Sequence, residues 1–281
     1  MKHAPTVCSI VPIIIAFKKY IPQYIKEIME DVIVSPYILS LLFFVVAFVY
    51  TSVGLAGGSS YIALMAIFGI NTLAIPMISL TLNVFASSIG SFNFIRNKHA
   101  RLQLILPFFI SSIPMSYLGG ALKVQKEIFY WILLISLIIV ALRIYVWDST
   151  AMKLNMGQTG KIVLSLLSGS VLGLVSGIVG IGGGIYLIPL IIIFGLGTEK
   201  EAAACGAIFI WANSLSGLIS RFQYNMIDLS AFVLPIIAVI AGSILGSFMG
   251  ATKFSPKTMQ KVLGMIIIVA ILLLLRKVLT M

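Results

Sequence analysis

Charged residues are scarce in this chain: they make up 10% of its 281 residues, against about a quarter in a soluble domain. Hydrophobic residues make up 60%, and the mean hydropathy is +1.14. The apolar runs are long and continuous, which is typical of helical membrane spans and unlike the alternating strands of a membrane barrel. The sequence therefore predicts an all-α integral membrane protein.

Cysteine and histidine are nearly absent, which excludes several kinds of site. The two cysteines, Cys8 and Cys205, lie near the N-terminus and inside an apolar run, so no disulfide framework is expected. With only His3 and His99 available, neither a metal site nor a cofactor is predicted. Both histidines lie outside the apolar segments and no HExxH motif occurs, so an intramembrane protease is not expected and the chain is not predicted to be an enzyme.

Acidic residues are also few, and all eight lie at or near the ends of the predicted segments. A cation carrier or a proton relay usually holds carboxylates inside the membrane, so their absence from the span interiors argues against both. The net charge of +11 comes from basic residues at the ends of apolar runs. That placement indicates membrane topology and contacts with lipid headgroups rather than binding of nucleic acid.

Glycine, by contrast, is concentrated in two stretches that repeat at a fixed offset of 126 residues. Residues 54–69 and 180–195 are identical at 8 of 16 positions, and Thr72 and Thr198 keep the same offset. The chain is therefore predicted to be a duplication. Its expected parts are an interfacial N-terminal extension (1–35), a first membrane repeat (36–147), a polar linker (148–160) and a second membrane repeat (161–281).

Each repeat is predicted to contain about five hydrophobic segments. The second segment of each holds only about 12 residues, which as a helix would cover about 18 Å of a membrane core about 30 Å thick. The predicted segments are 36–56, 58–69, 72–95, 102–122 and 127–147 in the first repeat, and 161–181, 184–195, 200–220, 229–251 and 258–279 in the second.

The topology depends on whether the two short segments cross the membrane. If they re-enter and return, twelve Lys and Arg residues share one side and six the other; if they cross, the split is ten to eight. Because basic residues accumulate on the cytoplasmic side, the first arrangement is favoured, with eight full spans and both termini cytoplasmic. The crossing arrangement stays open, and it would make the halves inverted repeats of five, a common plan among transporters.

The glycine breaks need a physical reason inside a membrane, where irregular backbone is tolerated only against protein or a wet cavity. Such a break exposes backbone amides and starts a new helix, whose N-terminus attracts anions. Paired Gly-interrupted segments at corresponding positions of two halves indicate a transporter site; close helix packing by small residues is the alternative. Candidate substrate-binding residues belong to the short segments and to the polar third segments: Gly57, Gly58, Ser59, Asn83, Ser87, Gly182, Gly183, Gly184, Tyr186, Asn213, Ser214 and Arg221.

A GxGGG run at Gly180 to Gly184 is followed by a short apolar segment with a proline, Pro189, and it has a degenerate copy in which Ala56 and Ala63 replace Gly182 and Pro189. The resemblance, over about residues 36–280, is to the TauE/SafE-type sulfite exporter family. It implies a secondary transporter, usually an exporter, of small sulfur-containing anions such as sulfite or organosulfonates across the cytoplasmic membrane. A channel or carrier for another small anion stays open. Expected partners are the anionic substrate and membrane lipids, with a homo-oligomer left open.

Overall fold

The computed structural model describes residues 35–52, 54–96, 100–145, 157–224, 232–252 and 256–279. Nearly all of the predicted N-terminal extension and most of the predicted linker lie outside these residues. The ten predicted segments are all helices, with bounds that differ from the prediction by a few residues. In the first half they are α2 (Pro36–Ser52), α3 (Gly58–Ile67), α4 (Ile75–Arg96), α5 (Leu102–Ala121) and α6 (Lys126–Tyr145). In the second half they are α7 (Gln158–Val179), α8 (Gly184–Ile193), α9 (Glu199–Tyr224), α10 (Val233–Thr252) and α11 (Pro256–Leu279).

Several of these helices are suited to a membrane by length and composition. Four are long and apolar enough to cross one, over Ile75–Asn93, Gln103–Ala121, Gln158–Val179 and Lys200–Gln223. Shorter apolar helices lie at Pro36–Ser52, Gly58–Ile67, Val233–Met249 and Ile267–Arg276. Large apolar side chains such as Phe92, Leu167 and Phe248 are more than half exposed on the outside of the bundle, as expected where lipid is the solvent.

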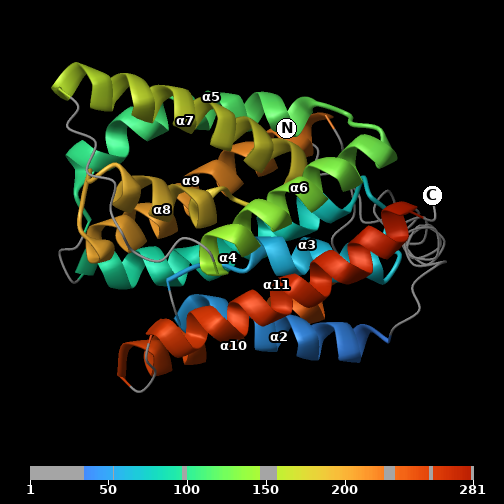
Figure 1. Ribbon diagram of the computed structural model, residues 1–281. Helices are drawn as coiled ribbons and strands as arrows, with labels where there is room; N and C mark the ends of the chain where they lie inside the picture. Colours follow the sequence, from blue (N-terminus) through green and yellow to red (C-terminus); the bar gives the residue numbers. More distant parts are fainter. Residues whose placement is uncertain are drawn as a thin grey trace, which may run out of the picture.

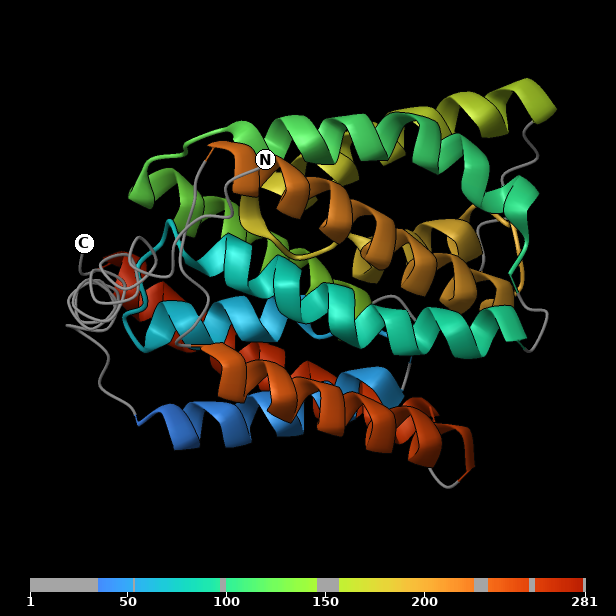
Figure 2. The same ribbon diagram turned by 180° about the vertical axis from the view of Figure 1, so that it is seen from behind.

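The helices form layers that combine the two halves of the chain. Figures 1 and 2 show α5 and α7 along one side of the molecule and α2 and α10 along the opposite side, with α3, α4, α8 and α9 between them. The first helix of each half thus packs against the fourth helix of the other half, and these two pairs have the most extensive contacts in the molecule. The short helices α3 and α8 lie inside, where α3 contacts α4 and α8 contacts α9.

Glycines set the close approach in the α5–α7 pair. On α7, Gly173 and Gly177 lie one turn apart on the same face. A Cβ at Gly173 would lie 2.3 Å from the carbonyl oxygen of Ser112, and one at Gly177 would lie 2.2 Å from that of Ser116. No real side chain fits at such distances, so the α7 backbone rests directly on α5, as in other small-residue contacts between membrane helices.

The α2–α10 pair is built in the same way. A Cβ at Gly242 of α10 would lie 2.5 Å from the carbonyl oxygen of Phe44, and one at Gly246 would lie 2.2 Å from that of Phe48. The buried hydroxyl of Thr51 also donates to the carbonyl of Ser243, at 3.2 Å. Both outer pairs therefore hold one helix from each half at backbone-to-backbone distance.

The directions of the helices show how the chain passes through the short segments. Glycines of α7 meet successive turns of α5 in the same order along both helices, so the two helices are parallel. Helix α9 is also parallel to α5, because Ser116 lies beside Asn213 and Gly120 beside Gly217. Since α7 and α9 are parallel, residues 180–198 must carry the chain back to the end of the bundle at which α7 starts. Figure 2 shows the same relation between α2 and α4, which run in one direction on either side of α3.

The favoured re-entrant topology is therefore wrong, and the crossing arrangement is the one observed. Ile178, near the end of α7, contacts Arg221 of α9. Gly184, at the start of α8, lies against Ile210, which is eleven residues, or about 16 Å, nearer the start of α9. Residues 180–183, in which Gly180 and Gly183 have left-handed conformations, carry the chain back along α9, and α8 continues in the same direction for about 15 Å. A short helix was expected to be too short to cross, but the break before it adds to its length.

Candidate functional site

Each short helix begins at a glycine in the left-handed conformation. Gly57, with φ +97°, precedes α3, and Gly183, with φ +76°, precedes α8. Three residues earlier, Gly54 and Gly180 have φ values of +80° and +90°. Neither helix has a side-chain cap, so the first amides of α3 and α8 lack the partner that a cap would give, and the positive end of each helix dipole is left open.

The two breaks meet inside the bundle. A Cβ at Gly58 would lie 2.6 Å from the carbonyl oxygen of Ile181 and 2.4 Å from Nδ2 of Asn83. A Cβ at Gly182 would lie 3.2 Å from the same Nδ2 and 3.2 Å from Oγ of Ser214. The start of α3 and the residues before α8 are thus in contact, and only the absence of side chains at these glycines permits it.

Two side chains of α4 bind the second break to the first half. Oγ of Ser79 donates to the carbonyl of Gly180 at 2.8 Å, and Nδ2 of Asn83 donates to the same carbonyl at 3.1 Å. Both side chains are completely buried. Asn83 was predicted as a site residue, whereas Ser79 was missed; its position one helical turn before Asn83, on the same face, was the available signal.

Several polar atoms around the breaks are buried without a protein partner. They include Oδ1 of Asn83, Oδ1 of Asn213 and Oγ of Ser214. The Nδ2 atom of Asn213 donates to the carbonyl of Phe209 one turn earlier, at 2.9 Å, and Oγ of Ser116 donates to the carbonyl of Asn213 at 2.8 Å. Buried polar groups normally have partners, so these three atoms mark a place where a ligand or water can complete the hydrogen bonding.

The remaining predicted residues of the first half lie near the same contact. Ser59 shares a hydrogen bond of 2.8 Å with the hydroxyl of Tyr50, which also bonds Ser60 at 2.7 Å. Oγ of Ser87 donates to the carbonyl of Asn83 at 2.5 Å. Tyr50 was not predicted; its hydroxyl holds the first turn of α3 against α2.

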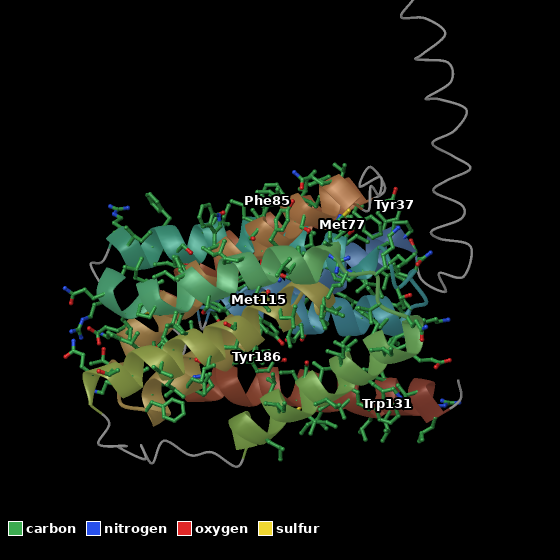
Figure 3. The ribbon with its side chains drawn as sticks, turned by 90° about the horizontal axis from the view of Figure 1, so that it is seen from above. Tyr37, Met77, Phe85, Met115, Trp131 and Tyr186 are labelled. Atoms are coloured by element: carbon green, nitrogen blue, oxygen red, sulfur yellow. The ribbon has the colours of Figure 1, made fainter. Side chains whose placement is uncertain are left out.

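In the second half, Gly183 and Gly184 face α9. A Cβ at Gly183 would lie 2.9 Å from the ring of Phe209, and one at Gly184 would lie 2.5 Å from the carbonyl of Gly206. The hydroxyl of Tyr186 is buried beside Ser136. Figure 3 shows Tyr186 within the bundle, whereas Tyr37 and Trp131 lie toward its edge.

Arg221, on α9, lies beside the C-terminal end of α7 and away from the contact between the two breaks. Its side chain is only 5% exposed, and Nη2 donates to the carbonyls of Gly177 and Ile178, both at 2.8 Å. A cation at this position satisfies the open carbonyls of a helix C-terminus and complements its dipole. A recess of about 20 Å³, enough for about one water, adjoins it and is lined by Thr72, Leu73, Pro76, Leu122, Lys123, Val124, Phe129, Ile178 and Arg221.

Among the residues that the structure describes, no group of three or more His, Cys, Asp or Glu side chains could hold a metal ion. Cys205 is buried and free. Glu201 forms a capping box with Thr198: its carboxylate accepts from the amide of Thr198 at 2.8 Å, and its own amide donates to the Thr198 hydroxyl at 3.3 Å. It serves the start of α9 and not the breaks.

Comparisons with known proteins agree with this architecture. The model of the family described as "Sulfite exporter TauE/SafE" matches residues 39–274. The curated "Probable membrane transporter protein y4hK" of Sinorhizobium fredii is 33% identical over 237 residues, which cover 83% of this chain and 95% of that protein. No solved structure matches. Both matches are to membrane transporters rather than enzymes. This multi-pass membrane protein belongs to the sulfite exporter TauE/SafE family of transporters.

Proposed function

We propose that this transporter moves small sulfur-containing anions, such as sulfite or organosulfonates, out of the cell across the cytoplasmic membrane. The observation that carries the proposal is the contact between the two glycine breaks, which brings the uncapped starts of α3 and α8 to one place inside the bundle. Helix N-termini bind anions through free amides and the helix dipole. The match to a family described as sulfite exporters supports the sulfur chemistry and the direction.

The neighbouring side chains suit an anion that is held by neutral donors. Ser214 is buried beside Gly182 with its hydroxyl unpartnered. In the part of the chain that the structure describes, Glu127, Glu199 and Glu201 lie in the first turn of their helices, away from the breaks. A cation would find no carboxylate at this contact, whereas an oxyanion would find amides and a hydroxyl.

We also infer that the two halves are copies in opposite orientation, with the substrate site between them. The short helices have the same length, start and end at the 126-residue offset, and begin at left-handed glycines. In each outer pair the first helix of one half packs against the fourth helix of the other half, α2 on α10 and α7 on α5. Transporters built from inverted repeats bind substrate between the repeats, at broken helices.

Flux measurements on purified protein in liposomes test the function. Liposomes loaded with sulfite should release it faster with the protein than without it, and sulfite should compete with ethanesulfonate. The matched variants are Gly58→Val, which fills the contact between the breaks, and Gly90→Ala, whose Cβ would meet only Ala207, at 3.8 Å. Gly58→Val should abolish flux and Gly90→Ala should preserve it. Chloride flux that sulfite and sulfonates do not inhibit would instead identify a channel or carrier for another anion.

A further inference from the structure

The orientation of the Asn83 side chain is fixed by its surroundings. Its Nδ2 atom lies 3.1 Å from the carbonyl of Gly180. A carbonyl oxygen can only accept a hydrogen bond, so the nitrogen must face it and Oδ1 must face away. Ser79 donates to the same carbonyl, which therefore accepts from two side chains of α4.

The acceptor atom of Asn83 is therefore a fixed feature of the contact between the breaks. The side chain is 0% exposed, and its Oδ1 has no partner. A Cβ at Gly58 would lie 2.9 Å from this oxygen, which puts the acceptor beside the first residue of α3. The donor of the same amide lies near Gly182, two residues before α8 starts. The acceptor thus lies beside the start of α3, while the donor of the same amide faces the second break.

An acceptor in an anion site selects against most anions. Sulfate and simple sulfonates carry only acceptor oxygens at neutral pH, and two acceptors that face each other cannot form a hydrogen bond. If a ligand leaves a buried acceptor of the protein without a donor, that ligand binds more weakly. A ligand that carries both an anionic group and an O–H or N–H donor satisfies the helix amides and the Asn83 acceptor together.

Resting on the proposed function, we propose that Asn83 makes the transporter selective for anions that carry their own hydrogen-bond donor, such as protonated sulfite or hydroxysulfonates. The anionic oxygens face the open amides of α3 and α8, and the donor faces Oδ1 of Asn83. Ser214 has a different part: its hydroxyl, beside Gly182, donates to an anionic oxygen that every substrate of the class carries.

Two sulfonates of nearly equal size separate these roles. Ethanesulfonate and 2-hydroxyethanesulfonate are both permanent anions and differ by one hydroxyl group. Binding of each to the purified full chain is measured by titration, and flux of each is measured in liposomes. The parent protein should prefer the hydroxylated anion by about tenfold or more, the ratio that the loss of one buried partner gives.

Variants assign the preference to one atom. Asn83→Leu removes the acceptor and leaves Ser79 on the Gly180 carbonyl, so the preference should fall to about one. Ser214→Ala should weaken both sulfonates and keep their ratio. Ser88→Ala is the matched control, because the Ser88 hydroxyl is exposed on α4 and donates only to Val84 of its own helix.

The outcomes separate this inference from the proposed function. Equal binding of the two sulfonates by the parent protein, or an unchanged ratio in folded Asn83→Leu, overturns the selectivity while the transport of sulfur anions stands. If neither sulfonate nor sulfite is bound or moved, the proposed function fails and the inference fails with it. If Asn83→Leu does not fold, Asn83→Ala takes its place: a ratio that falls to about one supports the acceptor, and an unchanged ratio counts against it.

Discussion

Asn83 on α4 donates to the carbonyl of Gly180, 97 residues later in the chain, and Ser79 donates to the same oxygen. The acceptor belongs to the second half and both donors belong to the first. One carbonyl at the start of the second break thus fixes the position of that break against the first half.

The first prediction concerns this shared acceptor. Ser79→Ala and Asn83→Leu should each lower the free energy of unfolding by about 1 kcal/mol, because the other donor remains on Gly180. The double variant should lose more than the sum of the two, since it leaves a buried carbonyl unpaired. Thermal melting of the detergent-purified proteins measures both, and strictly additive losses would show that the two donors act independently.

A second prediction concerns backbone strain at the second break. Gly183→Val puts a β-branched side chain on a φ of +76° and within 2.9 Å of Phe209, and should abolish anion binding. Gly195→Val introduces a similar strain at a φ of +60°, about 1–2 kcal/mol, with nothing within 4 Å. The control should therefore bind the anion. If folded, monodisperse Gly183→Val binds like the parent, the break is a packing device and the site lies elsewhere.

Arg221 gives a third prediction. Arg221→Gln should lower stability by about 1–3 kcal/mol, because the carbonyls of Gly177 and Ile178 lose a charged donor in a buried position. It should also weaken apparent anion affinity at low salt if the charge attracts the substrate. Arg221→Lys keeps the charge and so separates the two effects. If Arg221→Lys binds the anion like the parent but is as unstable as Arg221→Gln, the charge attracts the substrate. If both variants bind the anion like the parent, Arg221 only caps helix α7.

The fourth prediction tests the close contact between α5 and α7. Gly173→Ala should destabilise the protein by about 1–3 kcal/mol, because its Cβ would lie 2.3 Å from the carbonyl of Ser112. Gly90→Ala, also in a helix, should be neutral or stabilising by up to about 1 kcal/mol, since its Cβ has room. Melting temperatures that change equally in both variants would mean that the glycine face is not needed for packing.

The ten helices were predictable because apolar runs and their glycine or polar interruptions mark segment ends directly. The meeting of Gly58 with the Gly180–Gly182 stretch followed from the repeat itself. The topology was not predictable from charge, because a split of twelve to six against one of ten to eight is a weak bias. What decides it is that α7 and α9 are parallel, so the break and α8 together must return the chain between them.

The finer parts of the site depend on contacts between distant segments. The position of Ser79 one turn before Asn83 indicates a shared face, but nothing local shows that this face reaches Gly180. The spacing of Gly169, Gly173 and Gly177 predicts a flat helix face, but not that α5 receives it. The fixed orientation of the Asn83 amide appears only once its acceptor carbonyl is known.

Each outer pair joins one helix from each half of the chain, and this has a consequence for biosynthesis. As the chain emerges, α2 is made well before its partner α10, which begins only at Val233. Until then the face of α2 that α10 contacts has no cover from its own half, and the face of α5 that α7 contacts is uncovered until α7 is made. The main contact of each of these helices therefore forms only after part of the second half has been inserted.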